Sequence, residues 1–276
     1  MKYNKIFNIV ITVLIILLML LFLFPFIISV LVAVRTPEQT AQGVFVLPDR
    51  IHWENFTIAM EKTNFFLAFK NSAITTFGAT FAIVCVSSIN GYAISRFGKK
   101  PVFKFLEVLY LAALMIPGQI TMIPQYKVYH TLDLMNSLTG VILAFIGGCV
   151  PYSTFLYIRF VKTVPYALEE AARIDGCNRF TTFTHIVFPL LKPITATVAT
   201  LYTLWLWNDF NTALLLLQKD VVRTLPVKQY FFFGQYSADL HLAFASTILC
   251  TIPVLIFFLI AQKYIVAGIT VGSVKG

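Results

Sequence analysis

The sequence predicts an all-α membrane protein with six transmembrane helices and a polar helix-turn-helix hairpin at the membrane surface. The chain has 276 residues, of which 58% are hydrophobic and only 12% charged, whereas soluble domains carry about 25% charged residues. Six separate segments are long and apolar enough to cross a bilayer. Because a backbone in lipid must satisfy its own polar groups, each such segment is expected to be a helix rather than part of an open sheet.

The first predicted span covers residues 7–34, which carry no charge until Arg35. A secretory signal peptide has an apolar region of about 7–15 residues, so this segment is expected to remain as a membrane helix. The other predicted spans are about 71–95, 105–126, 138–158, a segment within 184–217, and 242–262. The frame of the fifth stays open between 186–206 and 193–217.

The whole chain, residues 1–276, is expected to form a single transmembrane domain with a core of about 68–265. With the N-terminus inside the cell, the inner segments hold thirteen Lys and Arg residues and the outer segments hold eight. This bias predicts cytoplasmic N- and C-termini. In the first outer loop, residues 52–69 fit either an amphipathic helix at the membrane interface or an ordinary soluble loop.

The most polar interruption of the apolar pattern is the segment 165–189. Pro165 suits the first position of a helix, where a missing N–H costs nothing. Glu169 and Glu170 suit its early turns because of the helix dipole. Gly176 permits a left-handed stop. A second helix is expected from Cys177 toward Pro189, so the segment predicts a hairpin that faces the cytoplasm.

Helical spacing places Ala167, Ala171 and Ile174 on one face of the first hairpin helix. A short helix with a slim apolar face and acidic neighbours can lie in a groove of another protein. The same segment could also be a structural connection that only joins the fourth and fifth spans.

The hairpin also carries the E-A-A, x3, G, x9, I-x-L-P pattern of the inner-membrane permeases of ATP-binding-cassette importers. The matching residues are Glu170, Ala171, Ala172, Gly176, Ile186 and Pro189, with Phe188 where Leu is usual. Further stretches resemble the shorter permease of the maltose-type carbohydrate uptake group. They are GYAISRF (91–97), MIPGQITMIPQY (115–126), EEAARIDG (169–176), WNDF (207–210) and VAGITVGSVKG (266–276).

This resemblance implies a permease subunit that imports a sugar or oligosaccharide by alternating access, with the hairpin as the coupling helix. The residues expected to couple to the ATPase are Glu169, Glu170, Ala171, Ala172, Ile174, Asp175, Gly176, Ile186 and Pro189. The implied partners are a second permease in a heterodimer, two ATP-binding subunits and an extracytoplasmic solute-binding protein, in the cell membrane of a prokaryote. The chain contains no G-x-x-x-x-G-K-[ST] loop, so ATP and magnesium are expected on the partner subunits and no cofactor on this chain.

The resemblance also suggests that the tail with Gly272, Lys275 and Gly276 reaches the ATPase interface as an extended segment, although it could be a frayed end. Asn90, Asn208 and Asp209 are candidates for the transport pathway or its gating. For Asn208 and Asp209, a structural or gating role is favoured over a sugar contact.

Other classes of function are less well supported. The net charge of +9 comes from scattered basic residues rather than one basic face, which argues against nucleic acid. The four cysteines show no metal-binding spacing, so no metal is expected. An intramembrane enzyme would need paired reactive groups, but Asp209 has no acidic partner in any predicted span. The same class of permease with another cargo, such as a polyol, a glycerol phosphate, sialic acid or an amino acid, remains open.

Overall fold

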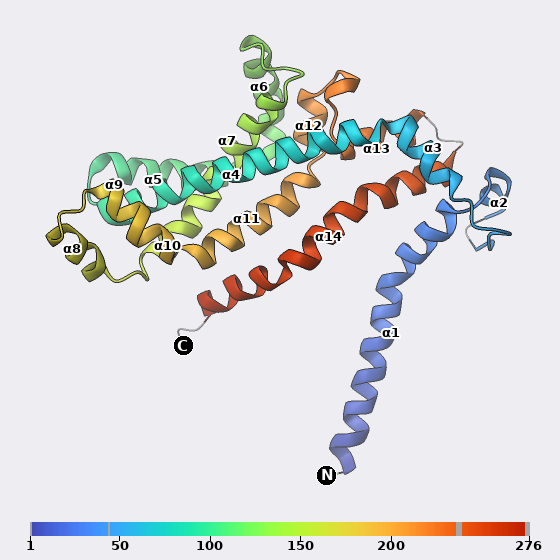
Figure 1. Cartoon of the computed structure of the whole chain (residues 1–276), viewed down its shortest axis with the longest axis horizontal. Helices are drawn as coiled ribbons and strands as arrows, with labels where there is room; N and C mark the ends of the chain where they lie inside the picture. Colours follow the sequence, from blue (N-terminus) through green and yellow to red (C-terminus); the bar gives the residue numbers. More distant parts are fainter. Residues whose placement is uncertain (1, 44, 236–238, 274–276) are drawn as a thin grey trace. The chain divides into compact units, whose positions relative to one another are not determined.

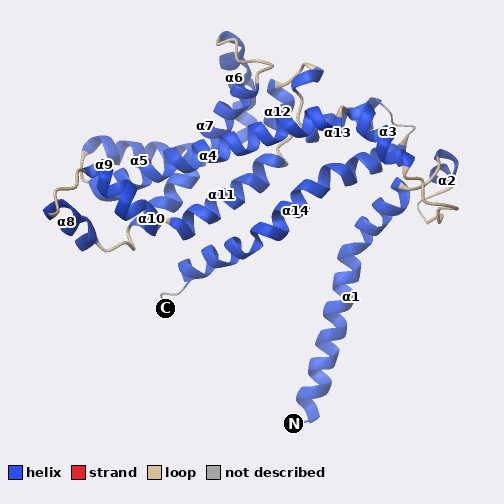
Figure 2. Ribbon diagram, viewed as in Figure 1, coloured by secondary structure: helices blue, strands red, loops and turns tan. Residues whose placement is uncertain are grey.

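The computed structural model describes residues 2–43, 45–235 and 239–273, and within them the side chains of 7–43, 45–230, 232 and 239–262. Every regular element in these ranges is a helix (Figures 1 and 2). The elements are α1 (Lys2–Ala33), α2 (Pro37–Ala41), α3 (Glu54–Thr63), α4 (Phe65–Phe97), α5 (Pro101–Leu114), α6 (Gly118–Thr131), α7 (Leu138–Val161), α8 (Tyr166–Ile174), α9 (Arg179–Thr182), the π-helix η1 (Phe183–Val187), α10 (Phe188–Leu190), α11 (Lys192–Trp207), α12 (Asn211–Leu216), the 3-10 turn η2 (Asp220–Val222), α13 (Leu225–Gln235) and α14 (Leu240–Ser273).

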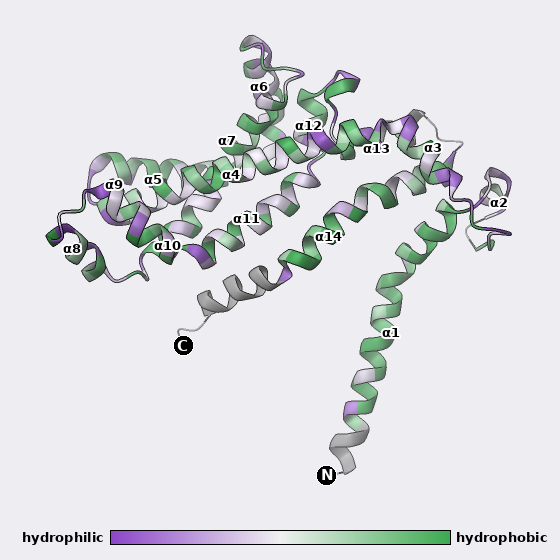
Figure 3. Cartoon of the chain, in the orientation of Figure 1, coloured by the Kyte–Doolittle hydropathy of each residue, from purple (hydrophilic) through white to green (hydrophobic). Residues whose placement is uncertain are grey.

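The described residues contain four helices that are long and apolar enough to cross a membrane, or six spans if two bent helix pairs each count as one. The four lie at Phe7–Ala33, Phe65–Phe97, Leu138–Val161 and Leu240–Gln262. Figure 3 shows α1 mainly in the hydrophobic colour, with a few paler turns. The predicted all-helical membrane fold is therefore confirmed, and four of the six spans, at Phe7–Ala33, Phe65–Phe97, Leu138–Val161 and Leu240–Gln262, begin and end within six residues of their expected bounds.

The third and fifth spans are each broken into two helices that meet at a sharp angle. In the third, α5 and α6 meet at 109° around Met115–Pro117, because Pro117 favours extended backbone before it and serves as the N-cap of α6. In the fifth, the helical arm that ends with α10 meets α11 at 75° at Leu191. The straight part of this span is α11, which ends at Trp207.

The chain separates into two compact units, one made of residues 1–66 and 228–253 and the other of 67–227 and 254–276. In the second unit, α7 packs against both α5 and α11. Buried hydroxyls hold the central helices together: Ser87 of α4 donates to Ser153 of α7 over 3.1 Å, and Tyr157 of α7 donates to Thr195 of α11 over 3.0 Å. Such interhelical hydrogen bonds are common between membrane helices.

Gly91 lets α4 and α7 approach closely. A Cβ atom at this position would collide with the Cβ of Tyr157, so any side chain here would push the two helices apart. Tyr157 itself is fully buried. This close approach lies two turns before the end of α4 and fixes where that end stands relative to α7.

In the first unit, the end of α1 packs on α3 and on the start of α14 through Ala33, Ala59 and Ala245. The amide of Asn55 donates to the carbonyls of Ala33 and Arg35, at 2.9 and 2.8 Å. Residues 54–63 are thus helical, as one of the two alternatives for this loop required. Their position at a membrane interface remains a prediction.

Candidate functional site

The first helix of the predicted hairpin is α8, and its two ends have recognisable caps. Pro165 lies in extended backbone and is the N-cap rather than the first helical residue. At the other end, the N–H of Cys177 donates to Ala172 O (2.9 Å) and that of Gly176 to Arg173 O (3.0 Å). This pair of bonds is the Schellman motif, which requires a left-handed residue. Gly176 supplies it with a φ of +84°, which confirms the predicted stop.

Glu169 attaches α8 to the end of α4. Its Oε1 accepts a hydrogen bond from Arg96 Nε at 2.6 Å, and its Oε2 accepts one from the Tyr92 hydroxyl at 2.9 Å. Arg96 also donates through Nη2 to the carbonyl of Val164 at 2.8 Å. We call these four groups, from Glu169, Arg96, Tyr92 and Val164, the Glu169 clamp.

The Glu169 clamp is buried: Glu169 has no exposed side-chain area, and the Arg96 side chain is 10% exposed. A buried ion pair contributes little net stability, because desolvation offsets its attraction, but the loss of one partner costs about 3–5 kcal/mol. The pair therefore strongly favours the conformation in which α8 stays attached to α4. The aromatic ring of Tyr166 lies 5.6 Å from the Arg96 guanidinium and 5.5 Å from that of Arg173, which adds cation–π contacts at the same junction.

The opposite face of α8 is exposed. Ala167, Glu170 and Ala171 are exposed, and Ile174 is 86% exposed. Glu169 and Ala172, by contrast, are buried. The predicted contact face of Ala167, Ala171 and Ile174 is thus not covered by the described part of the chain, and an exposed isoleucine next to a polar rim is a candidate anchor for a partner. Asp175 is exposed as well.

The second arm of the hairpin is more irregular than expected. Asn178 caps α9 by accepting a hydrogen bond from Thr181 N at 2.9 Å, after which the chain passes through the π-helix η1. Phe183 is buried against the ring of Tyr92, with the ring centroids 5.2 Å apart. Tyr92 therefore contacts both arms. Ile186 is half-buried and Pro189 exposed on this second arm.

The other predicted site residues do not join the hairpin. Asn90 lies on α4 and donates to the Tyr110 hydroxyl of α5 at 2.8 Å. Asn208 donates to Leu204 O at the end of α11. Because α11 has 16 residues, about 24 Å of helix at 1.5 Å per residue separates Asn208 from the hairpin.

Asp209 lies one residue before Phe210, the N-cap of the short helix α12, and accepts two hydrogen bonds from the first turn of this helix. Its Oδ1 accepts from Ala213 N at 3.1 Å, and its Oδ2 accepts from the Thr212 hydroxyl at 3.2 Å. Burial raises the pKa of the Asp209 carboxyl above its usual range. The carboxylate thus has a local structural use.

The tail differs from the expected extended segment. α14 continues as a helix through Gly268 and Gly272 to Ser273, so the extended form is wrong for these glycines, because an uninterrupted helical hydrogen-bond ladder outweighs their flexibility. Lys275 and Gly276 lie outside the described residues. Among the described residues, no three His, Cys, Asp or Glu side chains gather in a way that could hold a metal.

Sequence reasoning did not assign roles to Tyr92 and Arg96. Both lie in the GYAISRF stretch, which carries an arginine at the end of an apolar helix. A charged residue there is a sign of a specific partner, and this signal could have directed attention to the acidic hairpin.

The fold is that of a multi-pass helical membrane protein with an exposed, anchored hairpin. Residues 87–271 match the family described as the inner membrane component of binding-protein-dependent transport systems, and the chain belongs to this family. It is therefore a membrane transport subunit rather than an enzyme.

Similar chains include the melibiose/raffinose/stachyose import permease MelC of Bacillus subtilis, which is 34% identical over 84% of each chain. The multiple sugar-binding transport permease MsmG of Streptococcus mutans is 38% identical over 75% of this chain and 76% of that protein. A chain of a bacterial ABC transporter involved in alginate import has the same fold, with a TM-score of 0.80 at 24% identity, over 96% of this chain and 98% of that one.

Proposed function

We propose that this chain couples ATP hydrolysis by partner ATPase subunits to saccharide import, and that the exposed face of α8 is the docking surface. The observation that carries the proposal is the two-sided character of α8. One side is attached to α4 by the buried Glu169 clamp, while the other presents Ile174 at 86% exposure. A helix of this kind can seat in a groove of another protein through its exposed anchors.

The Glu169 clamp supplies a route for force. A displacement of α8 pulls on Arg96 and Tyr92, and both belong to α4, one of the long apolar helices. Because α4 packs closely on α7 at Gly91, the movement passes into the helical bundle. Rigid rocking of such helices is the basis of alternating access in transporters.

Individual residues take distinct parts in this proposal. Glu170, Ala171 and Ile174 contact the ATPase subunit directly, with Ala172 and Glu169 on the attached side. Asp175 and Gly176 form the turn, and Ile186 and Pro189 orient the second arm. The tail from Gly272 through Lys275 and Gly276 makes a second contact with the ATPase subunits. Asn90, Asn208 and Asp209 serve structural or gating roles.

The proposed assembly contains a second permease as a heterodimeric partner, two ATP-binding subunits that hold ATP and magnesium, and an extracytoplasmic solute-binding protein. The basic cluster around Arg96–Lys104 supports an orientation with the hairpin and both termini in the cytoplasm. The solute-binding protein then meets the opposite side of the membrane.

A saccharide is the favoured cargo because the names of several similar chains specify saccharides. They include the melibiose/raffinose/stachyose permease, the multiple-sugar permease, and the arabinooligosaccharide permease of Bacillus subtilis. Binding of saccharides to the cognate solute-binding protein, measured by calorimetry, tests this point. Binding of only a polyol, glycerol phosphate or sialic acid would assign another cargo to the same permease class.

The docking surface is tested by replacing Ile174 with arginine in the assembled transporter. Because a charged side chain cannot be buried unpaired in an apolar groove without a large cost, we expect ATPase subunits to co-purify at least about tenfold less. Val221→Arg is the matched control, since Val221 is also apolar and 61% exposed but lies in the η2 turn. Normal co-purification and cargo-stimulated ATPase activity of the Ile174→Arg variant would overturn the proposed surface.

A further inference from the structure

A basic hollow lies where α4, α5 and α7 come together, apart from the exposed face of α8. It has a volume of about 420 Å³, and its polar lining includes Ser95, Arg96, Lys99, Lys100, Glu107 and Lys162. This volume is within the range of small-ligand sites, about 300–1,000 Å³. Arg96 is already paired with Glu169, so the uncompensated charge of the hollow comes from its lysines.

The described residues that line the hollow include three lysines but a single carboxylate, that of Glu107. Lys99, Lys100 and Lys162 are exposed, and no carboxylate of the described residues forms an ion pair with them. Lys100 lies 5.8 Å from the ring centre of Phe97. The excess positive charge selects an anionic ligand.

Two further features of the walls fit a phosphate group. The Ser95 hydroxyl oxygen is buried and has no hydrogen-bond partner among the described residues, so a rotation of this side chain toward the hollow would let it donate to a ligand oxygen. α5 begins at Pro101 beside Lys100, and the N-terminal end of a helix carries positive potential. A phosphate accepts several hydrogen bonds and suits both features.

The surroundings of the hollow are apolar, which points to a lipid rather than a soluble anion. A narrow slot between α5 and α7, lined by Tyr110, Leu111, Leu114, Pro151 and Phe155, shares Glu107 and Ile158 with the hollow. Its volume of about 10 Å³ is too small to enclose an acyl chain. The acyl chain of the lipid would therefore lie along the outside of α5, where Val102 and Phe105 are each 65% exposed.

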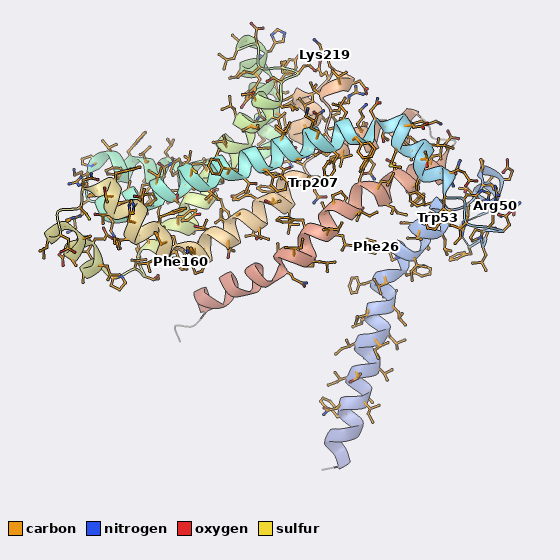
Figure 4. All side chains as sticks on the ribbon, in the orientation of Figure 1. Phe26, Arg50, Trp53, Phe160, Trp207 and Lys219 are labelled. Atoms are coloured by element: carbon orange, nitrogen blue, oxygen red, sulfur yellow. The ribbon has the colours of Figure 1, made fainter. Side chains whose placement is uncertain are left out.

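We infer that this hollow binds the phosphate headgroup of an anionic membrane phospholipid, with Lys99, Lys100 and Lys162 as its cationic contacts. Basic pockets between membrane helices bind such headgroups through charge attraction. The long lysine side chains can reach the headgroup level while their helices stay in the apolar layer. Figure 4 labels Phe160, which marks the end of α7 two residues before Lys162.

The site is tested with the assembled transporter in nanodiscs that contain phosphatidylglycerol and phosphatidylcholine. After extraction into detergent, native mass spectrometry counts the phosphatidylglycerol molecules retained on this chain. The variant Lys99→Gln/Lys100→Gln/Lys162→Gln is compared with Lys70→Gln/Lys127→Gln/Lys219→Gln. The control removes the same charge from exposed lysines elsewhere.

We expect the first variant to retain at least about tenfold less phosphatidylglycerol, because each lysine near an anionic surface strengthens binding several-fold. The control should change less than about twofold, since its lysines lie outside the hollow. Unchanged retention in the first variant, or equal loss in both, would overturn the site. Equal retention of phosphatidylcholine would overturn its selectivity for anionic lipids.

Inorganic phosphate distinguishes the lipid from a soluble anion. We expect phosphate in millimolar excess to leave the retained lipid in place, whereas competitive displacement would assign the hollow to a soluble phosphate compound. If the triple variant does not insert, Lys99→Gln/Lys162→Gln serves in its place. The readout does not use transport, so its failure would leave the proposed coupling function intact.

Discussion

The side chains of Arg96 and Glu169 meet across 73 positions of sequence, with Arg96 Nε 2.6 Å from Glu169 Oε1. The bond joins the end of a long apolar helix to a helix of nine residues in a connecting segment. Because both side chains are buried or nearly so, water does not weaken the contact, and α8 is attached where an isolated helix of its length would be unstable.

The two neighbouring acids Glu169 and Glu170 are predicted to have different roles. Glu169→Ala leaves Arg96 buried without its partner, at a cost of about 3–5 kcal/mol, so α8 should become sensitive to proteolysis and ATPase coupling should be lost. Glu170 is exposed, so Glu170→Ala should lower coupling without loosening α8. Limited proteolysis, together with cargo-stimulated ATPase activity, checks both, and equal protease sensitivity of the two variants would contradict the Glu169 clamp.

Gly176→Ala tests the left-handed turn of the hairpin. Beyond its two chain neighbours, a methyl group at this position would have no atom within 4 Å, so the effect should arise from the backbone alone. A non-glycine residue at a φ of +84° costs about 1 kcal/mol or more. Hydrogen exchange of residues 172–178 should speed up, and less so in Gly176→Asn, because asparagine tolerates the left-handed region better. If residues 172–178 exchange at the same rate in Gly176→Ala as in the native chain, the backbone strain expected at position 176 is refuted.

The segment around His52 is predicted to loosen as the pH rises. His52 Nδ1 lies 2.8 Å from Glu54 and Nε2 lies 3.2 Å from Asp49. The hydrogen bond with Glu54 raises the pKa of His52 above its usual value of 6.5, although burial and Arg50 oppose the change. For a histidine with a raised folded pKa, the stabilisation is present below the unfolded pKa and is lost as pH rises through the folded pKa.

Hydrogen-exchange protection factors for residues 50–56, measured from about pH 5 to pH 8, check this expectation within the range in which histidine titrates. Protection should fall with rising pH in the native chain. In His52→Gln the profile should be flat. A native profile without pH dependence would show that the His52 contacts do not stabilise this segment.

Asp209 offers a separate test at the far end of α11. Asp209→Ala should destabilise α12 by about 1 kcal/mol because it removes the acceptor for the Ala213 N–H in the first turn. Asp209→Asn keeps an acceptor oxygen and should retain this hydrogen bond. Transport assays then separate the hydrogen bonds of Asp209 from its charge. If Asp209→Asn transports the cargo and Asp209→Ala does not, the hydrogen bonds to α12 matter rather than the charge. A complete loss in Asp209→Asn would instead indicate a role for the carboxylate in gating.

The sequence was sufficient to predict where most helices lie and where the hairpin turns. Uncharged runs of apolar residues locate the spans, and the Gly176 stop follows from the rarity of left-handed backbone in other residues. The partners of the hairpin were not predictable in this way. Tyr92 and Arg96 lie 77 and 73 positions before Glu169 in the sequence, and contacts over such separations leave no periodic pattern.

The positions and angles of the breaks in the third and fifth spans did not follow from the prolines alone. Prolines occur in continuous helices of this chain, at Pro25, Pro151 and Pro253, as well as at the bends. Whether a proline bends a membrane helix depends on which neighbours satisfy the freed carbonyl. Composition alone does not decide this, so the 109° angle at Met115–Pro117 could not be anticipated.

The first helix, α1, depends less on the identity of its individual residues than the packed helices do. Over its apolar window none of α1 is buried by the rest of the described chain, and its side chains, such as Phe26, project outward from the helix in Figure 4. Among the α1 residues whose side chains are described, only Val32 and Ala33 are buried. Most of α1 can thus exchange one apolar residue for another. Its length and hydrophobicity should be preserved in evolution, while the identity of each apolar residue varies.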